Sequence, residues 1–478
     1  MKLTRRQTVL GLSASLAAPA LLAARPAMAA AEGRALVLPP IDEGRLSGGV
    51  RQFDLGIAAG RTEFFAGTPA ETIGINAPFL GPVLRARAGE MLRLNVANRL
   101  DEAAALHWHG LHLPVAMDGG PHQPIAPGAV WSPEFRLMQK AGTFWFHAHQ
   151  HGQTGRHVWA GMAGVIRVED EEEAALPLPR TYGEDDFTLI LQDRRFDADL
   201  QIPYAPDMHD RMSGLIGDRM LVNGQIGAHL PVDAPRIRLR IVNGANGSVY
   251  RLHFAGGEAF HQIASDGGLL PAPVSLTEAL MAPGERAEYL VDLTAGAPLL
   301  LKAEVFGAES PFAGSVGIRE VIELRPRTAH TSAPELPARL VDLPPPAPQT
   351  GKTRTFALAM TGMGLMGDFT INGARYDHDR VDFTVPLGAT ETWVIENRTE
   401  MLHPMHIHDV QFRILSRNGR PPQPREAGLK DVVLSHPGER LELRLSFADY
   451  ADPASTYMMH CHILEHEDAG MMQQFAVI

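Results

Sequence analysis

The chain has almost no thiol: Cys461 is the only cysteine among 478 residues, so no intrachain disulfide can form. Charged residues make up only 21% of the chain, and the net charge of −12 gives no basic footprint for nucleic acid. Beyond the N-terminal region, no stretch approaches the roughly 20 apolar residues that span a bilayer. The sequence therefore predicts a globular, acidic protein with neither a disulfide framework nor a membrane span.

The N-terminus predicts an export signal. Thr4-Arg5-Arg6-Gln7 is a twin-arginine start, an alanine-rich apolar stretch covers residues 9–24, and Ala27-Met28-Ala29 offers a small-residue cleavage site. We expect residues 1–30 to be a twin-arginine signal peptide and the mature protein to be periplasmic. The scarcity of cysteine agrees with an oxidising compartment, where spare thiols would be a liability.

The lone cysteine lies in a segment rich in metal-binding residue types. His460 and His462 flank Cys461, and His466 and Met471 follow. A thiolate, imidazoles and a distal thioether are the ligands of a blue-copper site. On a strand, Cys461 faces one way while His460 and His462 face the other. One short segment could therefore serve two metal sites.

Further histidines occur in three other short motifs. These are His107-Trp108-His109-Gly110, His147-Ala148-His149 and His403-Pro404-Met405-His406-Ile407-His408. With His460, His462 and His466 they account for ten of the 21 histidines. The alternative, core histidines beside a buried thiol, does not account for four such clusters around one cysteine.

A unit of about 150 residues occurs three times. Three strand-like stretches end in Asn98, Asn243 and Asn397, and each precedes a Pro-Gly turn, at residues 127–128, 283–284 and 437–438. Residues 441–447 alternate apolar and polar side chains, the period of a half-buried strand. We therefore predict an all-β protein of three Greek-key β-sandwich domains, at residues 45–170, 181–335 and 352–478. The stretches 169–180 and 343–348 have the composition of linkers.

The four motifs, in this order, resemble those of the multicopper oxidases over nearly the whole mature chain. The resemblance implies cupredoxin-like domains and four copper ions. It implies a type 1 copper on His403, Cys461, His466 and axial Met471, and a type 2 copper on His107 and His406. It implies a type 3 pair on His109, His147 and His462 and on His149, His408 and His460. Copper-free members of the superfamily have lost these residues, whereas this chain has all of them.

The repeat predicts where these sites lie. His147-x-His149 corresponds to His460-x-His462, and His107-x-His109 to His406-x-His408, at offsets of 313 and 299 residues. The first and third domains thus each supply two pairs, and the middle domain supplies none. We expect the trinuclear cluster between the outer domains, with the middle domain as a spacer.

The resemblance also implies the reaction: one-electron donors are oxidised and dioxygen is reduced to two waters. Oxygen reduction consumes protons, and Glu467 and Asp118 match the positions of acids near the copper cluster in related enzymes. We expect both to be catalytic proton relays. The alternative role for each is a carboxylate that orients a ligand histidine.

The electron donor is less constrained. Four methionines lie near the third domain's first strand or near His403: Met360, Met363, Met366 and Met401. Their placement resembles that of the Cu(I)-binding methionines of periplasmic copper-efflux (cuprous) oxidases. Thioethers are soft ligands that select Cu(I). The long Met- and His-rich insertion of that group is absent here. We therefore expect a monomeric oxidase for Cu(I), phenols or aromatic amines, active in copper tolerance. The alternatives are a general laccase or bilirubin-oxidase-like enzyme, a non-catalytic electron-transfer protein, and, for the methionines, ordinary core packing.

Overall fold

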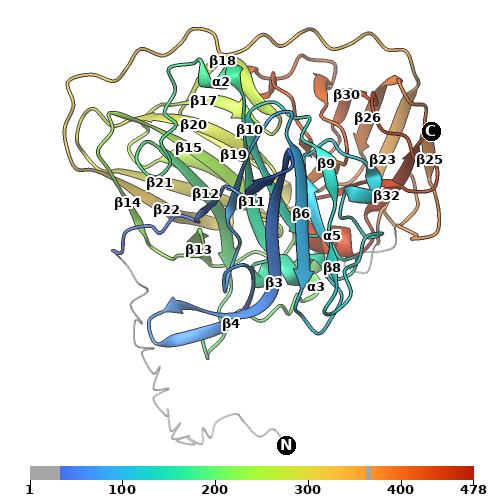
Figure 1. Ribbon diagram of the computed structural model, residues 1–478, viewed down its shortest axis with the longest axis horizontal. Coiled ribbons are helices and arrows are strands. Elements are labelled where there is room, and N and C mark those ends of the chain that lie inside the picture. Colours follow the sequence, from blue (N-terminus) through green and yellow to red (C-terminus); the bar gives the residue numbers. More distant parts are fainter. Residues whose placement is uncertain (1–32, 362–367) are drawn as a thin grey trace, which may run out of the picture.

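The computed structural model describes residues 33–361 and 368–478. Their strands form six sheets, which make three two-sheet units in succession along the chain. Figure 1 shows the first unit in blue and cyan, the second in green and yellow and the third in orange and red. The predicted all-β fold of three β-sandwiches is confirmed. The domain limits stay predictions, and the proposed signal peptide, residues 1–30, lies outside the described residues.

The first unit contains two sheets, ordered β1-β5-β11-β10-β7 and β2-β3-β6-β8, with β4 beside β3 and β9 beside β6. Its strands are β1 (Ile41–Asp42), β2 (Arg45–Ser47), β3 (Val50–Phe65), β4 (Thr68–Ile75), β5 (Val83–Arg87), β6 (Met91–Asn98), β7 (Leu106–His109), β8 (Val130–Trp131), β9 (Glu134–Arg136), β10 (Gly142–Ala148) and β11 (Ala163–Glu169). Its helical turns are η1 (Val115–Met117), α1 (Thr154–Ala160) and α2 (Glu171–Ala174).

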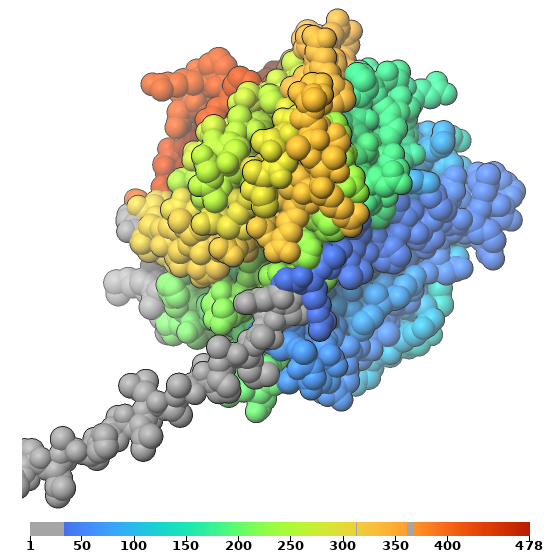
Figure 2. Space-filling model, turned by 90° about the vertical axis from the view of Figure 1, so that its left-hand side faces the viewer, coloured from blue at the N-terminus to red at the C-terminus, as the bar shows by residue number. Residues whose placement is uncertain are grey.

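The second unit has sheets ordered β13-β12-β15-β20-β17-β18 and β14-β22-β21-β16-β19. Its elements are β12 (Asp186–Arg194), α3 (Met208–Ser213), β13 (Arg219–Val222), β14 (His229–Val232), β15 (Arg236–Asn243), β16 (Val249–Phe254), β17 (Phe260–Ser265), β18 (Gly268–Leu276), β19 (Glu278–Met281), β20 (Arg286–Asp292), β21 (Leu299–Phe306), α4 (Ser310–Ala313) and β22 (Gly317–Pro326). Figure 2 shows this unit, in green and yellow, flanked by the blue first unit and the red third unit.

The third unit has sheets ordered β24-β23-β26-β30-β28 and β25-β32-β31-β27-β29. Its elements are β23 (Thr353–Thr361), β24 (Asp368–Ile371), β25 (Phe383–Val385), β26 (Thr390–Asn397), β27 (His403–Ile407), β28 (Arg413–Arg417), η3 (Pro424–Glu426), β29 (Val432–Ser435), β30 (Arg440–Ser446), β31 (Tyr457–Cys461), α5 (Leu464–Asp468) and β32 (Met472–Val477). Within the described ranges, no helix is both long and apolar enough to span a bilayer.

Each unit buries its own apolar core between its two sheets. In β30, Leu441, Leu443 and Leu445 are buried while the residues between them are not, as the alternation predicts. Alternation puts every second side chain on the inner face of a strand. The sandwich interiors therefore follow directly from the sequence pattern.

The three repeated asparagines close equivalent corners. Asn98, Asn243 and Asn397 each end a strand, and their backbone carbonyls accept hydrogen bonds from Gly128, Gly284 and Gly438 at 2.8, 2.9 and 3.0 Å. Their side-chain amides donate to two further carbonyls each. The corner therefore satisfies backbone groups that the end of the strand leaves unpaired, which explains why this pair of motifs recurs.

The first and second units meet across buried charges. Arg240 binds Asp186 (Nε–Oδ1 2.8 Å) and Glu288 (Nη1–Oε1 2.8 Å), and Arg238 also binds Glu288. From the first unit, Thr143 donates to the same Glu288 at 2.7 Å, and Arg167 pairs with Asp186 at 2.9 Å. All of these side chains are buried. The ionic network fixes the second unit against β10, which carries part of the site described next.

Candidate metal centre

Two pairs of neighbouring strands carry the histidine motifs. In the first unit β7 runs antiparallel to β10, with His107 opposite His147. In the third unit β27 runs antiparallel to β31, with His406 opposite His460. Because side chains two residues apart share a face of a strand, each His-x-His pair presents both imidazoles on one side.

These faces meet between the first and third units. His107 stacks on His408 with ring centroids 3.9 Å apart, and His109 stacks on His406 at 3.7 Å. The structure thus brings together the eight predicted histidines, all of them buried: His107, His109, His147, His149, His406, His408, His460 and His462.

Ring nitrogens converge inside this cluster. The Nε2 atom of His460 lies 3.3 Å from that of His149 and 3.2 Å from that of His408. Two further triplets of potential ligand atoms lie within 4.8 Å of one another, namely His109, His147 and His462, and His107, His406 and His408. Converging lone pairs repel each other unless a cation lies among them, so the arrangement suits metal ions.

The opposite ring nitrogens are held by acceptors. The Nδ1 atoms of His107, His406 and His147 donate to the backbone carbonyls of Asp118, Asp431 and Ala148 at 2.9, 2.8 and 2.8 Å. Such bonds fix the tautomer and leave Nε2 as the lone-pair donor. The His462 ring has no hydrogen-bond partner among the described residues.

Electrostatics favour neutral imidazoles here. Burial lowers the pKa of His408 to about 4 and that of His462 to about 3. It also lowers the pKa well below the usual value in five other histidines: His109, His147, His149, His406 and His460. Neutral imidazole is the form that binds metals. Orientation, burial and protonation state all fit a set of copper ligands.

A second group lies on the other face of β31. Cys461 Sγ is 3.7 Å from His403 Nδ1 and 3.6 Å from His466 Nδ1, and all three residues are fully buried. Burial raises the pKa of the thiol, and a bound cation would deprotonate it. The alternation predicted for the segment of residues 460–462 is therefore present, with Cys461 and the flanking histidines in different clusters.

The outer nitrogens of both histidines in this group are also bonded. His403 Nε2 donates to Thr399 Oγ1 at 2.9 Å, and His466 Nε2 donates to the Met212 carbonyl, in α3 of the middle unit, at 2.9 Å. Met471 is buried in the same core, and its carbonyl accepts from the Cys461 amide at 3.1 Å. Three of the four predicted residues thus lie together under a cover from the middle unit, and Met471 lies in the same core.

The two predicted acids lie beside the histidine cluster. Glu467, in α5, is buried, with carboxylate oxygens 3.5 Å from His149 Nδ1 and 3.2 Å from His460 Nδ1. Burial raises the pKa of Glu467. Asp118 accepts from His408 Nδ1 at 2.6 Å; burial opposes its ionisation, but His408 and His107 hold its pKa well below the usual range. The two carboxyls therefore have opposite tendencies to hold a proton.

The four predicted methionines have different settings. Met360, near the end of β23, is 38% exposed, whereas Met401 is 7% exposed and belongs to the core of the third unit. Met363 and Met366 lie outside the described residues. Of the two proposed Cu(I) ligands that the structure describes, Met360 is the more accessible to solvent.

Sequence reasoning missed Asp431 and Met212, both of which bond to site histidines. Asp431 lies six residues before Pro437, and the corresponding repeat positions hold Pro121 and Thr277. The repeat therefore gives no signal for it. Met212 contributes only its backbone carbonyl, which no side-chain pattern can indicate.

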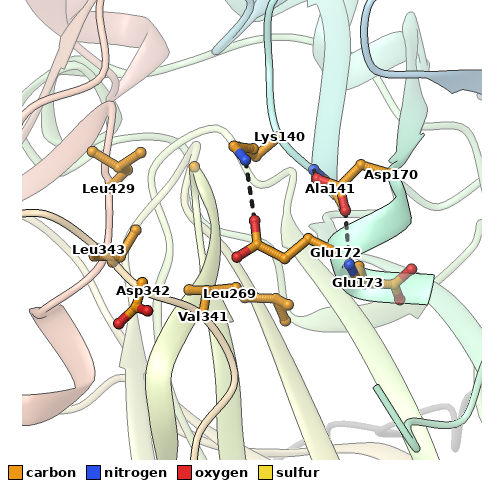
Figure 3. A pocket seen from close by; sticks show the side chains of 11 residues that line it. Lys140, Ala141, Asp170, Glu172, Glu173, Leu269, Val341, Asp342, Leu343 and Leu429 are labelled. Atoms are coloured by element: carbon orange, nitrogen blue, oxygen red, sulfur yellow. Dashed lines mark hydrogen bonds and ion pairs between the residues drawn. The ribbon is translucent and has the colours of Figure 1, made fainter. Parts of the chain in front are cut away.

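A small cavity of about 40 Å³ lies where the three units meet (Figure 3), but it is not this site. Lys140 and Glu172 form an ion pair at its edge, 3.0 Å apart, and Leu269, Leu343 and Leu429 line it. It has room for about one water, and none of its lining residues is a histidine. The histidine clusters are enclosed within the protein instead.

Comparison with known proteins agrees with this geometry. Residues 57–173 and 343–478 each match a multicopper oxidase family. The chain is 33% identical over 441 residues, 91% of each chain, to the multicopper oxidase mco of Staphylococcus aureus. It is 35% identical over 450 residues, 92% of each, to the cell division protein FtsP of Xenorhabdus nematophila.

A solved structure is similar over nearly the full length. The laccase-like multicopper oxidase CueO of the lignin-degrading bacterium Ochrobactrum sp. superposes with a TM-score of 0.83 at 35% identity, covering 93% of this chain and 100% of that one. Fold and site together define a copper-dependent oxidoreductase built of cupredoxin-like domains, whose oxidant is dioxygen. The chain belongs to the multicopper oxidase family.

Proposed function

We propose that this protein couples one-electron oxidation of Cu(I), or of phenols and aromatic amines, to four-electron reduction of dioxygen to water. The observation that carries the proposal is the link between two buried clusters. Cys461 belongs to one cluster, and its neighbours His460 and His462 belong to the other. When bound, the copper ions would supply the one-electron steps and the site of oxygen reduction. The chain supplies a short covalent path between them.

The ligand assignment is part of this proposal. The type 1 copper would be held by His403, Cys461, His466 and Met471, the type 2 copper by His107 and His406, and the type 3 pair by His109, His147 and His462 and by His149, His408 and His460. The convergent nitrogens and neutral imidazoles described above support this set of one, one and two ions.

Protons would come through Glu467. Burial raises its pKa and so favours the protonated carboxyl, which lies against His149 and His460. A buried acid in this state can donate a proton to a reacting oxygen. Asp118 has the opposite shift and a 2.6 Å bond to His408. We assign the proton relay to Glu467, and to Asp118 mainly the role of holding His107 and His408.

Electrons would enter the cysteine cluster on the side of His466 that α3 covers. Neither His403 nor His466 is exposed, so a donor does not touch either imidazole directly. The bond from His466 to the Met212 carbonyl makes α3 the cover of this cluster. A donor bound over α3 or beside Met360 would be separated from the ligand set by a short stretch of protein. This arrangement suits both a small aromatic donor and Cu(I).

We also propose that the protein works in the periplasm as a monomer, is exported by the twin-arginine pathway, and takes part in copper tolerance. The twin-arginine motif supports export to the periplasm, and the methionines support a role in copper tolerance. The likeness to FtsP, a cell division protein, raises a role without oxidase chemistry. The complete set of buried histidines favours the oxidase, because an electron carrier needs only the cysteine cluster.

Oxygen uptake by the copper-loaded protein tests the proposal. With either Cu(I) or a phenol, four electrons should be consumed per dioxygen. Met360→Leu combined with Met401→Leu should lower kcat/KM for Cu(I) at least about tenfold, about 1.4 kcal/mol, and leave phenol oxidation intact. Met138→Leu, at a 44% exposed methionine of the first unit, is the matched control.

The possible outcomes separate the alternatives. No oxygen uptake with any donor would leave an electron-transfer role. Equal losses on both substrates would indicate damage to packing around the cysteine cluster. Wild-type rates with Cu(I) would show that Met360 and Met401 do not bind Cu(I) and would favour the general laccase.

A further inference from the structure

The middle unit inserts one arginine into the junction of all three units. Arg286, the first residue of β20, is fully buried and forms two bonds with Asp431, Nη1–Oδ1 at 2.5 Å and Nη2–Oδ2 at 2.6 Å. Its remaining N–H groups donate to the carbonyls of Thr143, Gly284 and Asp266. With every donor direction engaged, the guanidinium holds one orientation.

Asp431 connects this arginine to two predicted copper ligands. Its carboxylate Oδ1 accepts from His109 Nε2 at 3.1 Å, and its backbone carbonyl accepts from His406 Nδ1 at 2.8 Å. His109 therefore directs Nδ1 into the cluster, where that atom lies 3.2 Å from His147 Nε2. The two hydrogen bonds to Asp431 thus fix which ring nitrogen of His109 and of His406 has a free lone pair for a metal.

The arrangement also prevents Asp431 from acting as a ligand. An Asp431 oxygen lies close enough to His109 and His406 for the three to hold an ion. Arg286 occupies both carboxylate oxygens. Among the described residues, Arg286 is the one arginine or lysine that pairs with the Asp431 carboxylate. The neighbouring Lys430 pairs with Asp266 and Glu285 instead. The carboxylate therefore remains an acceptor for the imidazole.

The first unit is shaped to admit this ion pair. Gly110 follows His109 with φ of +84°, and a Cβ placed there would lie 2.5 Å from Asp431 Oδ2 and 2.6 Å from Arg286 Nη2. Any side chain at Gly110 would displace the pair. Gly110, Arg286 and Asp431, one from each unit, thus meet around His109.

We propose that Arg286 is a positioning residue for the histidine cluster, acting through Asp431 on His109 and His406. The inference rests on the proposed copper sites. It gives the middle unit a direct part in building the cluster, beyond that of a spacer. Loss of an outer partner of a ligand histidine typically lowers metal affinity 10–100-fold. The effect should be confined to the histidine cluster, because Arg286 has no bond to the cysteine cluster.

The test uses Arg286→Met and Asp431→Asn in the full-length protein. After copper loading, bound copper is counted, and the blue absorption of the type 1 ion is compared with the paramagnetic resonance signal of the type 2 ion. The control is Arg238→Met, an equally buried arginine of the middle unit that pairs with Glu288 and Glu173 but with no histidine. Thermal unfolding of the copper-free proteins separates stability from metal binding.

We expect Arg286→Met to keep the blue band and to bind type 2 and type 3 copper at least tenfold more weakly. Asp431→Asn, which keeps an acceptor for His109 but loses the ion pair, should show the same loss in milder form. Arg238→Met should be destabilised with its copper ratio unchanged. If both Arg286→Met and Asp431→Asn bind all copper normally, or lose the blue band in step with the rest, the inference is overturned. A failure of Arg286→Met to fold leaves Asp431→Asn to decide.

Failure of the proposed function would look different. In that case the wild-type protein itself would not bind four copper ions or reduce dioxygen. A competent wild-type enzyme beside unaffected variants would reject only the role of Arg286.

Discussion

The three Pro-Gly turns allow a matched test of how the middle unit touches the histidine cluster. Gly128, Gly284 and Gly438 occupy equivalent corners with φ of +74°, +87° and +67°. A Cβ at Gly128 or Gly438 would meet nothing within 4 Å, whereas at Gly284 it would lie 2.9 Å from carbon atoms of the His462 ring. Alanine at the three positions therefore differs mainly in one steric contact.

The expected magnitudes follow from these contacts. A left-handed conformation costs a residue with a Cβ about 1–2 kcal/mol, and this cost is common to all three variants. Overpacking in a buried site adds about 1–3 kcal/mol, and only Gly284→Ala should show it. The total for Gly284→Ala is then about 2–5 kcal/mol, part of it appearing as displacement of His462.

Two measurements check the reasoning. Unfolding of the copper-free proteins should rank Gly284→Ala as the least stable, with the other two similar to each other. Copper loading should be normal for Gly128→Ala and Gly438→Ala, while Gly284→Ala should lose type 3 copper. If Gly284→Ala matches the other two in both measurements, the contact with His462 has no consequence and the reasoning fails.

Three further changes test other parts of the site. Cys461→Ser should abolish the blue absorption and turnover while the fold persists; appreciable oxygen uptake would show that the assignment of Cys461 is wrong. Glu467→Gln should retain all copper but slow reoxidation by dioxygen about 10²-fold or more, measured by stopped flow; an unchanged rate would reduce this carboxyl to scaffolding. His112→Gln should lose stability in a pH-dependent way. Burial alone would lower the pKa of His112, but Asp409 and Asp449 raise it to about 9. A raised folded-state pKa gives stability that is fully present below the ordinary value of 6.5 and lost as pH rises through about 9. Burial raises the pKa of Asp409 to about 6, so this partner loses its charge at lower pH. The deficit of His112→Gln should therefore be largest near pH 7, at most about 3 kcal/mol, and should shrink as pH rises to about 10; a deficit that does not vary with pH would contradict this.

Much of the fold could be predicted because short sequence motifs determine its strand ends, its turns and the faces of its strands. Asn98, Asn243 and Asn397 do end strands, and the Pro-Gly turns do bond back to them. The His-x-His spacing required two imidazoles on one face of a strand, and the repeat placed those strands in the outer units. Each of these inferences uses short-range geometry that the sequence alone determines.

The rest of the site depends on how the units dock, which no local pattern encodes. Arg286 corresponds to Val130 and Arg440 in the other repeats, so its position in the unit does not mark it. Asp431 acquires its role from contacts with the first and second units. Met212 acts through a carbonyl on a short helix. Among the described residues the clustered histidines come from the outer units. The middle unit is nevertheless more than the predicted spacer, because Arg286 and the Met212 carbonyl contact the site.

The buried charges between the first two units have a consequence for the environments in which the protein can work. Dissolved ions weaken surface ion pairs, but they screen buried pairs much less. High salt should therefore leave Arg167 of the first unit paired with Asp186 of the second unit. Burial would raise the pKa of Glu288, but Arg238 and Arg240 lower it to about 2. The stability contributed by the ionised Glu288 is fully present above its ordinary pKa of 4.5 and is lost as the pH falls through about 2. The docking of these units should resist salinity and yield first to acid.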